Sequence, residues 1–282
     1  MRASSWLGLV VVVVAGSGCF EERNRSIALM NQGVEAARQK LFDSAARDLK
    51  QAVATDPSNH LAWYNLGIVY KDQKKWSDAA NAFNEAVKQE GGNASYHYEL
   101  GNAYQEDGKL DQAKSEYEAC IRVDGRQYKA HYRLGTLLIK MDKPREADAE
   151  LRKAIELNPR FVSSFLVLGN LYYDHDYDKE AVQVFQNAVL ANEASGDAHY
   201  GLGLSLKKTR QYEEAVKEFK KAYELNSELF LAVYNLGMTY KDMDDKKNAR
   251  EWLQRFITGA GSKGSADLMK AASDAMYQLD AP

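Results

Sequence analysis

The sequence predicts an all-α solenoid of stacked helix hairpins, and two observations carry that prediction. Glycine recurs at every thirty-fourth position without an insertion or deletion, at Gly33, Gly67, Gly101, Gly135, Gly169, Gly203 and Gly237. Alanine repeats the same step at Ala45, Ala79, Ala113, Ala147, Ala181, Ala215 and Ala249. A fixed period over most of a chain indicates similar supersecondary units that each pack on their neighbours, rather than a globule around one deep core.

The first element in chain order has the pattern of a secretory signal. Arg2 precedes an apolar run from Trp6 to Ala15, and Gly16, Ser17 and Gly18 follow it. The run is too short for a membrane-spanning helix, which needs about 20 apolar residues. We therefore expect residues 1–18 to be a signal peptide.

Cys19 directly follows these small residues, and the segment resembles the lipobox of bacterial lipoproteins. The resemblance implies that Cys19 is lipidated and becomes the new amino terminus, although Gly16 stands where a leucine-like residue is usual. Several acyl chains anchor a protein firmly. Because Phe20 rather than aspartate follows, the resemblance further implies the outer membrane, with the chain facing the periplasm and residues 19–25 as a short tether. The alternative is an ordinary secretory signal with a chance cysteine.

The second repeat unit shows why each unit should be a hairpin. Large apolar residues at i, i+3 and i+7 predict one face of a first helix, and they are Trp63, Leu66 and Tyr70. Apolar residues at i, i+4 and i+7 predict a second helix, and they are Ala79, Phe83 and Ala86. The polar stretch 71–75 leaves room for a turn. Two such helices cannot bury their apolar faces alone and must stack on neighbouring units.

The recurring glycine lies inside each first helix, where it costs roughly 1 kcal/mol relative to alanine. Seven such costs are understandable if two helix backbones approach closely at these points. The second helix carries a large residue at the matching step, namely Leu49, Phe83, Tyr117, Leu151, Phe185, Phe219 and Leu253. We expect small and large residues to interlock there.

These residues resemble the tetratricopeptide repeat family, whose unit has the same period and carries W-x₂-L-G-x₂-Y and then A-x₃-F. The resemblance implies a right-handed superhelix of seven hairpins, over 26–59, 60–93, 94–127, 128–161, 162–195, 196–229 and 230–258. A loop over 259–265 and a capping helix over 266–282 should follow. The edges depart from the pattern, as expected of caps: Leu29 replaces the tryptophan in the first unit, and Phe256 takes a small-residue position in the seventh.

Composition limits the classes of partner. The formal net charge is −3 with 37 basic and 40 acidic residues, and no basic stripe of the kind that nucleic acid requires is evident. The mean hydropathy is −0.53, and the apolar run before Cys19 stands alone in the sequence. The second cysteine, Cys120, occupies a position where other units have alanine, which indicates a buried small residue more than a reactive thiol.

No catalytic, cofactor or metal site is expected. His97, His131 and His199 occupy the packing position of Trp63, and equivalent positions in adjacent units should be about 10 Å apart. Zinc ligands must lie about 2 Å from one point. The sequence also lacks nucleophile, phosphate-loop and H-E-x-x-H motifs. We therefore expect a protein without enzymatic activity.

A partner-binding groove is expected along the first helices. Tyrosine follows the packing position in five units, at Tyr64, Tyr98, Tyr132, Tyr200 and Tyr234. In the resembled family this position faces the inner, concave side. Further polar candidates on this side are Asn102, Asn170, Arg133, Lys71, Lys207 and Lys241. Tyrosine provides a large contact area with few rotatable bonds, which suits protein recognition. The alternative is that the tyrosines pack between neighbouring first helices.

The functional hypothesis is a lipid-anchored scaffold at the outer membrane that binds protein partners. Lipoproteins of this architecture resemble the pilotin-type factors of type IV pilus secretins and scaffolds of motility machinery, so the resemblance implies help in assembling an envelope machine. An alternative is an adaptor that regulates peptidoglycan hydrolases or synthases. Neither hypothesis requires a cofactor.

Overall fold

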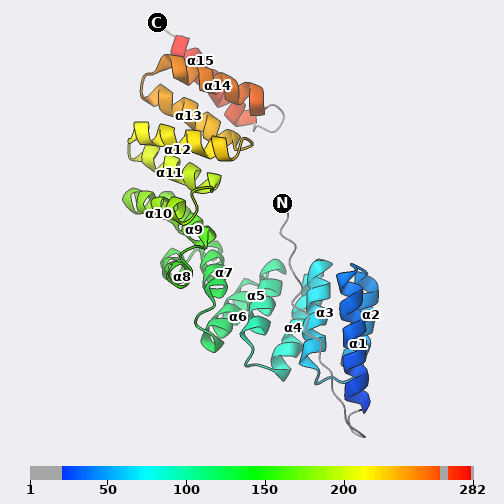
Figure 1. Cartoon of the computed structure of the whole chain (residues 1–282). Coiled ribbons are helices and arrows are strands. Elements are labelled where there is room, and N and C mark those ends of the chain that lie inside the picture. The colour runs from blue at the N-terminus through cyan, green and yellow to red at the C-terminus, as the bar shows by residue number, and fades with distance from the viewer. Residues whose placement is uncertain (1–20, 261–265, 281–282) are drawn as a thin grey trace. The chain divides into compact units, whose positions relative to one another are not determined.

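The computed structural model describes residues 21–260 and 266–280, and all of the regular structure in these residues is helical. Figure 1 shows the helices following one another in antiparallel pairs. The chain divides between Lys143 and Pro144 into two compact units, one with helices α1 to α7 and one with α8 to α15. The all-α repeat fold that the regular spacing of glycine and alanine predicts is therefore confirmed.

Each repeat contributes a first helix and a second helix, which together form one hairpin. The first helices are α1 (Glu21–Arg38), α3 (His60–Asp72), α5 (Ala94–Glu106), α7 (Tyr128–Lys140), α9 (Val162–Asp174), α11 (Gly196–Lys208) and α13 (Phe230–Asp242). The second helices are α2 (Phe42–Thr55), α4 (Trp76–Gln89), α6 (Leu110–Val123), α8 (Pro144–Leu157), α10 (Asp178–Ala191), α12 (Tyr212–Leu225) and α14 (Lys246–Ala260). The last helix is α15 (Ala266–Asp280).

The ends of the repeat array differ from the expected boundaries. Within the described residues, helix α1 spans Glu21–Arg38, so the part of the expected tether over residues 21–25 is helical. Glu21 and Glu22 lie in the first turn, where negative charge interacts favourably with the helix dipole. Helix α14 extends to Ala260, past the expected end at residue 258. Residues 1–18, Cys19 and the segment 261–265 lie outside the described residues.

The glycines inside the first helices allow the two helices of a hairpin to touch. A Cβ atom at Gly67 would lie 2.6 Å from the Phe83 ring, and one at Gly203 would lie 2.7 Å from the Phe219 ring. Gly33, Gly101, Gly169 and Gly237 are in the same position against the large residue on their second helices, at 2.7 to 2.8 Å. The interlocking predicted from the spacing is confirmed at these six positions.

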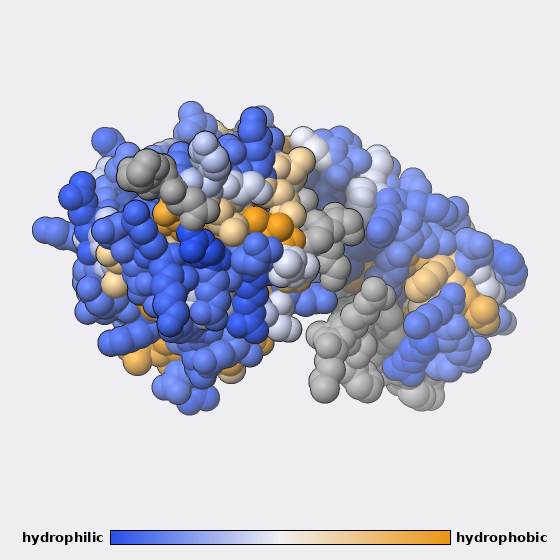
Figure 2. Space-filling view, turned by 90° about the horizontal axis from the view of Figure 1, so that it is seen from above, coloured by the Kyte–Doolittle hydropathy of each residue, from blue (hydrophilic) through white to orange (hydrophobic). Residues whose placement is uncertain are grey.

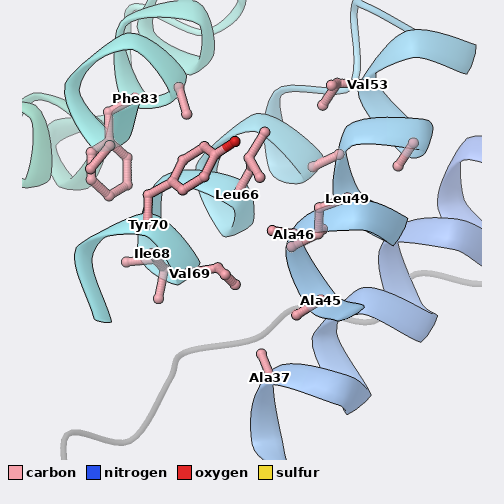
Figure 3. Close-up of a cluster of buried hydrophobic side chains, with 14 of the residues drawn as sticks. Ala37, Ala45, Ala46, Leu49, Val53, Leu66, Ile68, Val69, Tyr70 and Phe83 are labelled. Carbon is pink, nitrogen blue, oxygen red and sulfur yellow. The ribbon is translucent and has the colours of Figure 1, made fainter. Parts of the chain in front are cut away.

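The core continues from one hairpin to the next. Figure 3 shows Ala46 and Leu49 of α2 together with Leu66 and Val69 of α3, in the space where the two helices meet. Leu49 and Phe83 are completely buried. Each hairpin thus closes the apolar face of its neighbour, as a repeat fold requires.

The turn inside each hairpin requires one residue in the left-handed backbone region. That residue recurs once in every repeat at the same position, and its φ lies between 57° and 78° at Lys40, Lys74, Gly108, Asp142, Asp176, Arg210 and Asp244. Only the third repeat uses glycine there. Five turns between repeats begin instead with an Asp or Asn side chain that accepts a backbone N–H two residues on, as Asp124 does from Arg126 at 3.0 Å. The turn after the second repeat has Glu90 at this position.

One face of the protein shows the character of its surface. Figure 2 shows one face, which is largely hydrophilic with small hydrophobic areas. Within residues 21–260 and 266–280, no helix has the length and hydrophobicity needed to cross a bilayer.

Candidate protein-binding face

We call the surface formed by the first helices the first-helix face, which is α3, α5 and α7 in one unit and α9, α11 and α13 in the other. All of the tyrosines that the sequence analysis singled out lie on these helices, and each is half-buried. Part of each tyrosine side chain is therefore packed against the protein, and part of it lies on the surface. Their individual contacts decide what the face can bind.

Tyr64 of α3 is held by its neighbours in the next repeat. Its ring stacks on Tyr96 of α5 with centroids 4.9 Å apart, and it lies 5.6 Å from the Phe83 ring. Burial raises the pKa of the Tyr64 hydroxyl well above its ordinary value, so this hydroxyl is neutral. The Tyr96 hydroxyl lies 2.7 Å from His60 Nδ1. This end of the face is an ordered aromatic cluster.

Arg133 of α7 is a half-buried cation among aromatic rings. Its guanidinium interacts electrostatically with the Tyr98 oxygen of α5. Burial opposes its charge, but the oxygens of Tyr98, Tyr117 and Tyr132 raise the Arg133 pKa above its usual value. Arg133 therefore keeps its charge beside phenol oxygens.

A polar network joins α3, α5 and α6 beside this cation. Lys71 forms a 2.9 Å ion pair with Glu99 of the next first helix. The Tyr117 hydroxyl donates to Asn102 Oδ1 at 2.9 Å. Asn102 Nδ2 lies 3.5 Å from Glu99 Oε2 and links the two contacts. The positive charge that the sequence analysis assigned to Lys71 is therefore matched by a carboxylate on the same face.

The first-helix face of the other unit is less polar. Tyr200 of α11 accepts a 3.2 Å hydrogen bond from Asn235 of α13, and burial raises the pKa of its hydroxyl to about 12. The Tyr234 ring lies 5.3 Å from Phe256. Leu204 and Met238 lie half-buried on the same helices.

The lysines of this unit also have partners. Lys207 lies 3.3 Å from Asp242 Oδ2, and Lys241 donates to Gln278 of α15 at 2.7 Å. Asn170 is exposed on α9. The face thus offers aromatic rings, amides and paired charges more than free cations.

The buried histidines have structural contacts. His97 and His199 each place Nδ1 near a glutamate, Glu116 at 2.7 Å and Glu218 at 2.5 Å. Their Nε2 atoms lie 3.0 Å and 3.1 Å from backbone carbonyl oxygens of the preceding turn. Both ring nitrogens are therefore engaged. Among residues 21–260 and 266–280, no three His, Cys, Asp or Glu side chains gather as metal ligands would.

Cys120 is buried on α6, and burial raises the pKa of its thiol to about 11. A thiol with so high a pKa is a poor nucleophile at neutral pH, because the thiolate is the reactive form. The arrangement agrees with the packing role that the sequence predicts.

Sequence reasoning missed Tyr96, Glu99 and Asn235. Tyr96 occupies a position where the second and sixth repeats have Ala62 and Ala198. That departure was a visible signal for Tyr96. Glu99 and Asn235 have no such signal, because their roles depend on Lys71 and Tyr200 in the preceding repeats.

Models of the tetratricopeptide repeat match residues 30–95, 94–127, 128–161, 196–229 and 232–258. Together they cover more than half of the chain. This chain belongs to the tetratricopeptide repeat family. The fifth repeat, residues 162–195, lies outside the matched ranges. Proteins of this repeat class use the surface of the stacked helices for binding other proteins.

Solved structures show the same fold. The MamA protein is 24% identical with a TM-score of 0.58, covering 61% of this chain and 93% of MamA. YrrB, described as a TPR protein with an unusual peptide-binding site, is 22% identical with a TM-score of 0.56, covering 67% of this chain and 97% of YrrB. Pseudomonas aeruginosa PilF is 18% identical with a TM-score of 0.63, covering 78% of this chain and 98% of PilF. No curated protein matches this tetratricopeptide chain in sequence.

Proposed function

We propose that this tetratricopeptide protein is a non-enzymatic scaffold that binds a segment of a protein partner along its first-helix face while lipid on Cys19 holds it at the outer membrane. Confinement to the membrane raises the effective concentration of the scaffold near membrane-bound partners without any new contact. The task is to assist assembly or localisation of an envelope machine, such as a type IV pilus secretin or a motility complex.

The observation that carries the binding role is the preformed set of contacts around Arg133. The oxygens of Tyr98, Tyr117 and Tyr132 favour the charged form of this cation, and the adjoining network fixes Asn102 and Glu99. Side chains that are already ordered lose little conformational entropy when a partner binds. A half-buried cation beside amides suits a segment that carries an acidic group and backbone carbonyls. The peptide-binding site described for YrrB shows that this fold can hold a peptide.

The anchoring role is supported by the sequence from Arg2 to Cys19. Because α1 begins at Glu21, a lipid on Cys19 would lie two residues from the first helix. The first repeat would then be held close to the lipid surface. The pilus and motility assignment is supported by the resemblance to lipidated repeat proteins of pilotin type, and the likeness to PilF adds a shared fold.

Cross-linking in native membranes followed by mass spectrometry tests the binding role. Tyr132→Ala removes a half-buried ring beside Arg133, and we expect at least a tenfold loss of partner capture, which is about 1.4 kcal/mol. Tyr277→Ala is the matched control, since this tyrosine is 79% exposed on α15. Equal loss in both variants, or a large drop in the melting temperature of Tyr132→Ala, would contradict the proposal. Secretin, pilus or motility subunits support the assembly role, whereas peptidoglycan hydrolases or synthases would support the adaptor alternative.

Membrane fractionation tests the anchor. Cys19→Ser should leave the precursor without lipid and remove the protein from the outer-membrane fraction. Intact-mass measurement of the wild-type protein should show the added acyl chains. An unchanged distribution of Cys19→Ser would overturn the anchor and leave the binding role to be judged by the cross-linking result.

A further inference from the structure

Helix α10 differs from the other second helices in its charge. Its residues 181–191 contain no Asp, Glu, Lys, Arg or His, whereas the same stretch of every other second helix carries at least two charged side chains. This uncharged stretch belongs to the fifth repeat, the one outside the family matches. Depletion of charge is a feature of the central part of protein–protein interfaces.

The uncharged stretch presents a ridge to solvent. Its exposed members are Gln183, Gln186, Asn187 and Leu190. Leu190 is 75% exposed, more than any other large aliphatic side chain among the described residues. Positions 183, 186, 187 and 190 follow the i, i+3, i+4 and i+7 spacing of one helix face.

Beside this ridge, α8 and α10 border two adjoining pockets over α9. One pocket has a volume of about 220 Å³ and is lined by Ile155, Phe165, Leu168 and Val184, with Asn187 at its edge. The other has a volume of about 390 Å³ and is lined in part by Asp148, Tyr172 and Tyr177. Arg152 borders both pockets and connects them. Figure 1 shows α8, α9 and α10 following one another in the same unit.

The charges at the apolar pocket are already paired. Arg152 Nε lies 3.1 Å and 3.0 Å from the two Asp148 carboxylate oxygens, and its guanidinium stacks 5.6 Å from the Tyr172 ring centroid. Glu156 is paired with Lys153 at 2.8 Å. A charged group entering this pocket would lose water without gaining a counter-ion. Electrostatic complementarity therefore requires an occupant whose buried face is uncharged.

We propose that α10 and the α8/α10 groove form a second docking site, which takes an uncharged aliphatic face of an amphipathic helix from a partner protein. The ridge of residues 183–190 can pack against a second helix as ridges pack into grooves. The uncharged stretch, residues 181–191, is about 16 Å long, which matches about three turns of a partner helix. One aliphatic side chain of that helix enters the 220 Å³ pocket. The ridge lies on a second helix and the pocket is lined by residues of α8, α9 and α10, but none of the side chains described for the first-helix face lines it.

The test uses the full-length protein and a fluorescent synthetic peptide long enough for about four helical turns. The peptide carries leucine at i, i+3, i+7 and i+10, and glutamine, serine or alanine elsewhere. Fluorescence anisotropy should show binding that Leu190→Glu weakens at least tenfold. Leu41→Glu is the matched control, because Leu41 is also exposed, at 55%, but lies in a hairpin turn of the other unit. A peptide with glutamate in place of the leucine at i+7 should bind at least tenfold more weakly.

Three outcomes of the peptide experiment would overturn the second docking site. They are absence of peptide binding, equal loss with both protein variants, and cross-linking of the peptide to a photoreactive residue at position 132 rather than at position 187. Sedimentation of the protein alone must also be the same for wild type and Leu190→Glu. A shift from dimer to monomer in that variant would show that a second copy covers α10. None of these results bears on Tyr132→Ala capture, so this proposal and the proposed function can fail separately.

Discussion

At the scale of single residues, histidine can replace tryptophan in this chain because the ring N–H of both residues can reach the equivalent backbone carbonyl. Trp63 Nε1 donates to the Pro57 carbonyl at 3.0 Å, six residues earlier. His97 Nε2 lies 3.0 Å from the Gly91 carbonyl oxygen at the same spacing. A carbonyl oxygen only accepts, so Nε2 carries a proton. The smaller histidine ring leaves room for Glu116 at the place of Ala82 in the previous repeat, and the second ring nitrogen faces that carboxylate.

The His97–Glu116 pair should make stability depend on pH. The hydrogen bond from His97 to Glu116 raises the pKa of His97 above its ordinary value, although burial opposes this. A raised folded-state pKa gives stability that is complete below the unfolded value, near pH 6.5, and is lost as pH rises through the folded value. We expect Glu116→Gln to lower the His97 pKa in an NMR titration and to cost on the order of 1 kcal/mol at pH 6. The difference from wild type should shrink by pH 9, and a constant difference would contradict the ion pair.

The left-handed turn residue allows a second test in which packing plays no part. Gly108 has a φ of 78°, and a Cβ atom there would meet nothing within 4 Å. Gly108→Ala therefore changes the backbone energy alone, and we expect a loss of about 1 kcal/mol in unfolding free energy by denaturant titration. Gly125→Ala is the control, because its Cβ would be 3.7 Å from the nearest atom and its φ lies outside the left-handed region. Equal effects of the two substitutions would show that conformation at position 108 is not the cause.

At the scale of helices, the contact between Gly67 and Phe83 sets the spacing of a hairpin. Alanine favours a helix by about 1 kcal/mol over glycine, yet a Cβ at position 67 would lie 2.6 Å from the Phe83 ring. We expect the clash to dominate, so Gly67→Ala should destabilise the protein by about 1–3 kcal/mol. In the Phe83→Ala background the same substitution should become neutral or stabilising. A cost that persists there would show that the ring is not what position 67 must avoid.

Contacts between repeats add a second periodic feature. Lys50, Arg152 and Lys220 on second helices each lie 5.6 Å from a tyrosine ring of the following first helix, at Tyr70, Tyr172 and Tyr240. All three pairs have the same separation in sequence. A cation over an aromatic face is attracted by the ring quadrupole. These pairs connect successive hairpins, whereas the glycine contacts connect helices within one.

The sequence predicts contacts inside a hairpin better than contacts across hairpins. Gly67 and Phe83 can be paired from the sequence because the repeat period fixes both positions. Lys71 and Glu99 cannot, because the second and third repeats use different residue types at each of these positions, and only the stacking brings the side chains together. The tyrosines were expected to face a partner or to pack, and the structure leaves each of them half-buried, so that each packs and also reaches the surface. The absence of charge over residues 181–191 of α10 can be read from the sequence. The docking site could be inferred only once the structure showed the pockets beside this helix.

At the scale of the molecule, stability is shared between neighbours. Among the helices described, substantial contacts join helices that are adjacent or two apart in chain order. Unfolding of such an array is governed by the stability of each repeat and by its interfaces with its neighbours. A local defect should therefore remain local.

Hydrogen exchange measured by mass spectrometry tests this locality with the Gly67→Ala variant. Protection should fall in α3 and α4, which form the altered hairpin, and to a smaller extent in α2 and α5, which contact it. The amides of α9 to α14 should exchange as in the wild type, because their contacts do not include the altered hairpin. Gly237→Ala is the reciprocal variant, since a Cβ there would lie 2.8 Å from Leu253 and should loosen α13 and α14 instead. Uniform loss of protection over both units in either variant would show that the array unfolds as one cooperative body, and the nearest-neighbour description would then be wrong.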